Sequence, residues 1–100
     1  MVAKFGNKEI ELKFTFKSFK YMGDFNIADL ADIEYKPFKI ATIASTLLLG
    51  AANNGSVMVA PSEVDRYLEE CIENDTLSEL VEELVKLLEE SNFFKALQKK

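Results

Sequence analysis

The spacing of the hydrophobic residues changes partway along this 100-residue chain. Between residues 9 and 17, charged or polar residues alternate with an apolar set, which is Ile10, Leu12, Phe14 and Phe16. This period of two is typical of a half-buried strand. Further along, apolar residues recur every three or four positions, as they do in amphipathic helices. The sequence therefore predicts an α+β fold, mostly α, with its strands at the start.

A β-hairpin is predicted over residues 1–16. Residues 2–5 supply the first strand, and Gly6-Asn7 supplies a two-residue turn of the kind that joins paired strands. An isolated hairpin is only marginally stable in water, so its apolar face must pack on other elements. We expect the helices that follow to cover that face.

About five helices are predicted to form a bundle over residues 17–100, and residues 1–100 are expected to form a single domain. A short helix is expected from Phe16 or Ser18 to Met22, ended by Gly23, and a weaker helical pattern covers residues 24–33. Pro37 is expected to open a central helix that is buried on several sides. The turn-rich run over residues 50–55 is predicted to end that helix.

Capping signals predict where the last helices begin. Ser62 with Asp65, just after Pro61, resembles a capping box, although glutamate is the usual partner. Thr76 with Glu79 matches the box fully. A short terminal segment containing Phe93, Phe94 and Leu97 completes the predicted bundle.

The acidic helix after Thr76 has a continuous apolar face, and its opposite, solvent-exposed face is rich in glutamate. Such a helix suits docking against a partner's hydrophobic helix, because its charges keep the complex in solution. The chain also holds more aromatic residues than a small bundle hides with ease, which favours a partner or self-association surface. The residues predicted to bind a partner are Leu77, Leu80, Leu84, Leu87, Phe93 and Phe94.

The residues for most catalytic chemistry are missing. The chain has no histidine, the commonest general base and metal ligand, and no glycine-rich phosphate loop. Its single cysteine, Cys71, lies on an apolar helix stripe and is expected to be structural. Asp24, Asp29 and Asp32 do not follow the ligand spacing of a calcium loop. We therefore expect no catalytic site, no cofactor and no metal.

The charges are divided unevenly along the chain. The net charge is −5, but residues 1–20 carry +3 and residues 61–100 carry −6. An acidic body argues against nucleic-acid binding, which needs clustered basic residues. The longest apolar stretch, around residues 43–52, is shorter than a membrane span. With no signal peptide in view, the chain is expected in the cytoplasm, away from membranes.

The run from Phe5 to Phe16 resembles the start of the tail assembly chaperones of long-tailed phages that infect Gram-positive bacteria. Those chains begin with a small hairpin of the pattern Asn-Gly-Lys-Glu-aromatic-x-Leu-Lys-Phe. Here the turn is Gly6-Asn7, and Ile10 stands where an aromatic residue is common. A central apolar helix, a Pro-Ser helix start and an acidic last helix extend the similarity over nearly the whole chain.

The resemblance implies a non-enzymatic function. Members of this family bind the hydrophobic tape-measure protein, keep it soluble and help to recruit the tail-tube protein. They self-associate as homo-oligomers and act in the host cytoplasm, and they are absent from the mature virion. The family has no catalytic residues to carry over.

Two alternatives remain open from the residues alone. One is a small acidic regulatory module of a phage or bacterium, of the antitoxin or anti-repressor kind, whose acidic face clamps a protein or mimics nucleic acid. The other is a small enzyme built on carboxylates such as Asp24, Asp29 and Asp32. Neighbouring genes distinguish the first from a tail chaperone, and a pocket with convergent carboxylates would favour the second.

Overall fold

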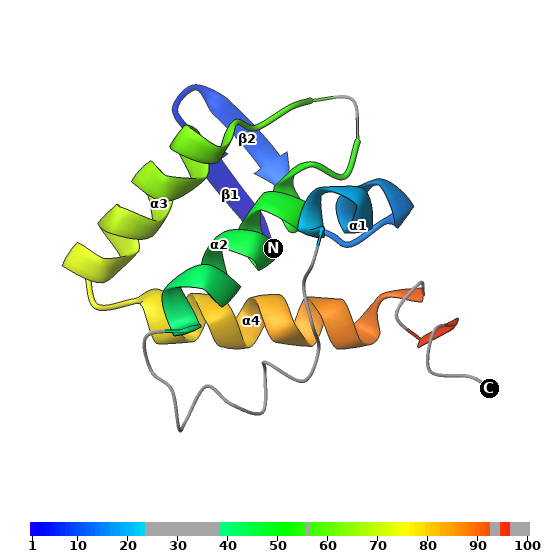
Figure 1. Cartoon of the computed structure of the whole chain (residues 1–100). Helices are drawn as coiled ribbons and strands as arrows, with labels where there is room; N and C mark the ends of the chain where they lie inside the picture. Colours follow the sequence, from blue (N-terminus) through cyan, green and yellow to red (C-terminus); the bar gives the residue numbers. More distant parts are fainter. Residues whose placement is uncertain (24–38, 56, 93–94, 97–100) are drawn as a thin grey trace.

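A computed structural model describes residues 1–23, 39–55, 57–92 and 95–96 of the chain (Figure 1). The described elements are two strands and four helices: β1 (Val2–Phe5), β2 (Lys8–Glu11), α1 (Phe16–Met22), α2 (Lys39–Ala52), α3 (Pro61–Glu73) and α4 (Leu77–Glu90). The predicted α+β class, mostly helical with an N-terminal hairpin, is confirmed.

The number of helices is a correction, because the described residues contain four rather than about five. The weaker helical pattern over residues 24–33 lies outside the described residues. Phe93, Phe94 and Leu97 of the predicted terminal segment also lie outside them.

The hairpin forms as the turn residues predict. β1 pairs antiparallel with β2, and Phe5 opposes Lys8 across the Gly6-Asn7 turn. Gly6 has a φ of 63°, which glycine adopts at the first central position of a tight hairpin turn without steric cost. Ala3, Phe5 and Ile10 are buried on the inner face, so the hairpin packs on the helices as expected.

Strand β2 ends at Glu11, so the prediction that the hairpin continues to residue 16 is wrong. Phe16 begins α1, one of the two predicted helix starts, and is 63% exposed. The cause is a capping box, in which Thr15 accepts from the Ser18 amide and Ser18 accepts from the Thr15 amide. These contacts turn the chain into a helix just after the alternation has placed Leu12 and Phe14 in the core.

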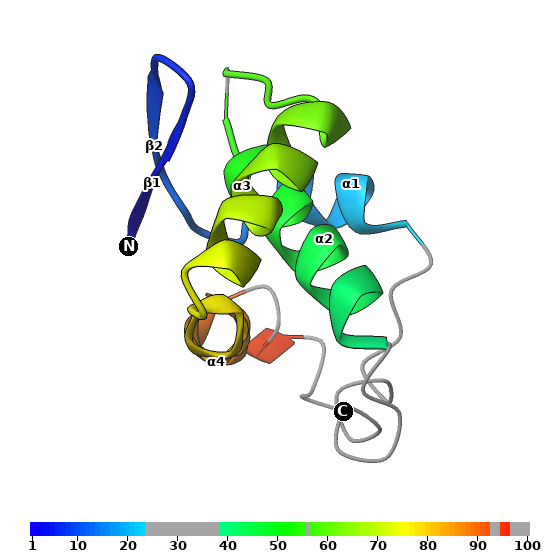
Figure 2. The ribbon, with the colours of Figure 1, turned by 90° about the vertical axis from the view of Figure 1, so that its left-hand side faces the viewer.

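The α2 helix is the centre of the fold, with α1, α3 and α4 packed against it (Figure 1). It continues through Gly50 to Ala52, so the prediction that residue 50 begins the break is wrong. Seen from the side, the hairpin forms an outer layer beside α3 (Figure 2). Among the described residues, no helix combines the length and the hydrophobicity that crossing a membrane requires.

The predicted capping boxes of α3 and α4 are both wrong. Helix α3 begins at Pro61, with Ala60 as its N-cap and no side-chain cap. Thr76 is the N-cap of α4, as predicted, but its hydroxyl donates to the Cys71 carbonyl rather than capping α4. Proline at the first helical position lowers the need for a cap. It has no backbone N–H, and an N–H at that position would have no hydrogen-bond acceptor within the helix.

Candidate docking groove between α2 and α3

The α4 leucines predicted to bind a partner divide into two groups. Leu80 and Leu84 are buried in the core of the chain. Leu77 and Leu87 are partly buried and pack against the edge of that core. Phe93 and Phe94 lie outside the described residues. A partner role for these six residues stays a prediction, and Leu77 is the one that lines a surface groove with α3.

This groove has a volume of about 220 Å³ and runs between α2 and α3 to the start of α4. Ala41, Ala44 and Ser45 of α2 line one side of it, and their small side chains leave room for a partner's side chain. The rest of the lining is Asp65, Leu68, Glu69, Ile72 and Leu77. We call this set the α2–α3 groove.

Ile72 is the exposed apolar residue of the α2–α3 groove. It follows Leu68 by one helical turn, but Leu68 is buried, whereas Ile72 is 60% exposed. Covering the remaining surface of an isoleucine stabilises a complex by up to about 1.5–3 kcal/mol. The sequence placed Ile72 on the apolar stripe of α3 without marking it as a binding residue. The missed signal was its position in the last turn of that stripe, close to the turn into α4.

Carboxylates border the groove along α3. Asp65 and Glu69 are exposed and lie four residues apart, on the side that lines the groove. An apolar floor with an acidic border complements a helix whose apolar side chain is flanked by lysine or arginine. The groove therefore suits recognition of a helical segment through packing and charge together.

A second apolar hollow, with a volume of about 330 Å³, lies between α2 and α4. Its lining consists of Ile40, Ser78, Val81, Glu82 and Val85. Apolar surface is therefore available on α4 as well as in the α2–α3 groove.

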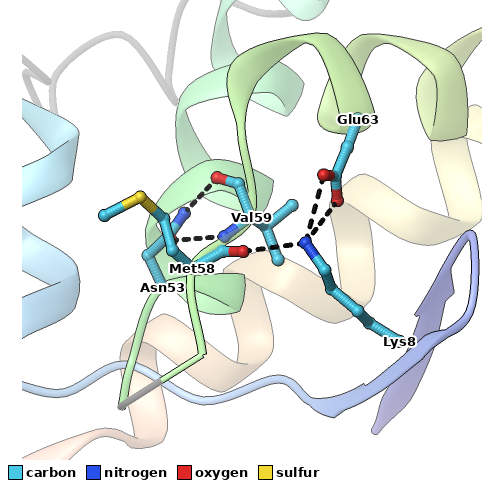
Figure 3. Close-up of polar contacts among 5 residues, drawn as sticks. All are labelled: Lys8, Asn53, Met58, Val59 and Glu63. Carbon is cyan, nitrogen blue, oxygen red and sulfur yellow. Dashed lines mark hydrogen bonds and ion pairs between the residues drawn. The ribbon is translucent and has the colours of Figure 1, made fainter.

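Buried polar contacts fix α3 relative to α2 (Figure 3). The Asn53 side chain accepts from the Val59 amide at 2.8 Å and donates to the Val59 carbonyl at 3.0 Å. It also donates to the Leu49 carbonyl at 2.8 Å and is almost fully buried. These bonds hold together the two ends of the loop that joins α2 to α3.

The hairpin is fastened to the same region by Lys8. Its ammonium group donates to the Met58 carbonyl at 3.1 Å and forms an ion pair with Glu63 at 3.1 Å (Figure 3). The rings of Phe5 and Tyr67 lie 5.1 Å apart between the hairpin and α3. Burial raises the pKa of the Tyr67 hydroxyl above 10.0, and charge on Cys71, Glu83 and Glu70 raises it further.

The described residues hold no group of three or more histidine, cysteine, aspartate or glutamate side chains arranged to bind a metal ion. Asp24, Asp29 and Asp32 lie outside the described residues. Comparisons of the chain with protein-family models, with curated proteins and with solved structures found no match.

Proposed function

We propose that this chain is a tail assembly chaperone of a long-tailed phage, acting by binding rather than by catalysis. Its main client is the tape-measure protein, which it keeps soluble while the tail-tube protein is recruited. It acts in the host cytoplasm as a homo-oligomer and is absent from the mature virion. The resemblance of the run from Phe5 to Phe16 supports this proposal, together with the hairpin followed by helices.

The observation that carries the proposal is the α2–α3 groove with its exposed Ile72. Tape-measure chains are long helices with exposed apolar stripes, and such stripes aggregate unless they are covered. An apolar groove of one helical turn or two covers part of a stripe without unfolding either protein. A chain that binds its client in this way shifts the client away from aggregation by mass action.

The acidic charge supports the same function. Residues 61–100 carry a net charge of −6, and the exposed faces of α3 and α4 hold most of it. Net charge keeps a complex of chaperone and client in solution. The acidic border of the groove adds attraction for basic residues of the client.

Co-expression with a fragment of the tape-measure protein from the same genome tests the proposal. We expect the fragment to be insoluble alone and soluble with this chain, and the two to elute together in size-exclusion chromatography. A fragment that stays insoluble, beside a soluble and folded chaperone, would contradict the proposal. A toxin or repressor gene next to this reading frame, in place of a tape-measure gene, would favour the regulatory alternative.

A further inference from the structure

The two edges of the hairpin differ in how their backbone groups are satisfied. Phe5 and Lys8 flank a two-residue turn, and the Leu12 amide donates to the Met1 carbonyl at 2.8 Å. In an antiparallel pair the hydrogen-bonded positions alternate. The amides and carbonyls of Val2 and Lys4 therefore point outward from β1, and those of Glu9 and Glu11 point outward from β2.

The outer edge of β2 faces the loop after α2, which satisfies one of its outward backbone groups. The Asn54 side chain donates to the outward Glu11 carbonyl at 2.9 Å, as a neighbouring strand would. Nothing comparable satisfies β1, because no hydrogen bond of the described residues uses the outward amides of Val2 or Lys4. The β1 strand has no proline and no bulge to block pairing, and Val2 is 57% exposed.

A groove of about 290 Å³ lies between the turn end of the hairpin and α3, and it reaches the outer edge of β1 at Lys4. Lys4 and Phe5 line it from β1, while Glu63, Arg66, Tyr67 and Glu70 line it from one face of α3. This face differs from the one that borders the α2–α3 groove, so the two grooves lie on separate sides of α3. The rings of Phe5 and Tyr67, which are tilted by 38° to one another, form an aromatic floor.

We propose that the outer edge of β1 and the groove against α3 bind an extended, acidic peptide segment of a partner by adding a third strand to the hairpin. Strand addition takes its affinity from backbone hydrogen bonds and its specificity from pockets for alternate side chains. Here Val2 and Lys4 supply the backbone groups, and the Phe5–Tyr67 floor supplies the pocket.

The charged side chains that line this groove determine which kind of peptide it binds. Lys8 and Glu63 are paired with each other, so their charges offset. Lys4 and Arg66 form no ion pair with any described residue, and Glu70 is the one remaining carboxylate of the lining. The groove therefore has an excess of positive charge on an otherwise acidic protein, which favours a segment carrying glutamate or aspartate. This site is independent of the client groove proposed above.

A defined peptide tests the proposal. The probe is Ac-Thr-Val-Glu-Val-Glu-Val-Thr-NH₂, and its control carries lysine in place of both glutamates. We expect saturating acidic peptide to slow hydrogen exchange of the Val2 and Lys4 amides at least tenfold, and to leave the Glu9 and Glu11 amides unchanged. The basic peptide should have no such effect, and Arg66→Glu should weaken binding of the acidic peptide at least tenfold.

Two proline variants locate the binding edge. Val2→Pro removes an outward amide of β1 and takes no bond from the hairpin ladder, and Glu9→Pro makes the matched change on β2. We expect Val2→Pro to weaken peptide binding at least tenfold and Glu9→Pro to leave it unchanged. Unchanged exchange at Val2 and Lys4 in millimolar acidic peptide would overturn the proposal, as would an equal effect of the basic peptide. Slowing that depends on protein concentration without peptide would also overturn it and assign the edge to a second copy of the chain.

Discussion

Gly50 of α2 lies directly against Met22 of α1. A Cβ atom placed on Gly50 would stand 2.6 Å from the Met22 Cγ and 3.2 Å from the Ser18 carbonyl oxygen. No pair of carbon atoms packs at 2.6 Å, so the absence of a side chain at Gly50 lets α1 approach α2. This glycine serves helix packing in the middle of the fold, rather than ending the helix.

Gly50→Ala should therefore destabilise the protein by about 1–3 kcal/mol through overpacking, although alanine favours helices. Met22→Ala alone should also destabilise, since Met22 is buried. In the Met22→Ala background, however, Gly50→Ala should cost much less, because the contacts with the Met22 side chain are gone and only the 3.2 Å approach to the Ser18 carbonyl oxygen remains. Urea denaturation of the four proteins of this double-mutant cycle checks the expectation, and additive effects would contradict it.

Asn53→Ala should cost about 2–4 kcal/mol of stability. The substitution leaves the buried Val59 amide and carbonyl without their partners, and unsatisfied buried groups carry their full desolvation penalty. Asn92→Ala is the control, since Asn92 is exposed, and it should change stability by less than about 0.5 kcal/mol. Equal urea midpoints for the two variants would show that the Asn53 contacts do not hold the loop.

Lys8→Met should have a small effect despite the two contacts of the ammonium group. The side chains of Lys8 and Glu63 are 42% and 35% exposed, and exposed ion pairs contribute at most about 1 kcal/mol. Added salt should bring the wild-type thermal midpoint towards that of the variant, because salt screens exposed charges. A loss above about 2 kcal/mol would mean that Lys8 is structurally essential to the hairpin.

Stability should fall at high pH because of Tyr67. Its folded pKa is raised above 10.0 by burial and by nearby negative charge, so the folded protein favours the neutral hydroxyl. The resulting stabilisation is fully present below pH 10 and is lost as the pH rises through the folded pKa. Urea denaturation of the wild type and of Tyr67→Phe between pH 8.5 and 11 isolates this contribution. A stability difference that stays flat across the range would contradict the expectation.

Local patterns predicted the hairpin and the inner faces of α3 and α4 from the sequence. Gly6-Asn7 requires a tight turn, and the alternation before residue 15 places Leu12 and Phe14 in the core whether or not they pair as strand. Phe16 continued the alternation by coincidence, because the Thr15–Ser18 capping box begins α1 there. The alternation of apolar and polar residues does not show that a capping box will end the extended conformation and begin a helix at the next residue.

The parts that the sequence did not predict depend on tertiary contacts. Gly50 looked like a helix breaker because its packing partner, Met22, is distant in sequence. The α2–α3 groove combines residues of α2, α3 and α4, and no spacing within one helix shows which side of a stripe the neighbours leave open. Leu80 and Leu84 were predicted from the same stripe as Leu77, yet they lie inside the core.

The most direct test of the proposed function compares Ile72→Lys with Val57→Lys in a binding titration against the tape-measure fragment. Both residues are exposed and apolar, at 60% and 49%, so neither substitution should unfold the protein, and only Ile72 lines the α2–α3 groove. We expect Ile72→Lys to weaken binding roughly tenfold or more, since a lost central contact is worth about 2 kcal/mol, and Val57→Lys to leave it within about twofold. Equal affinities for the two variants and the wild type would contradict the assignment of the α2–α3 groove as the client site.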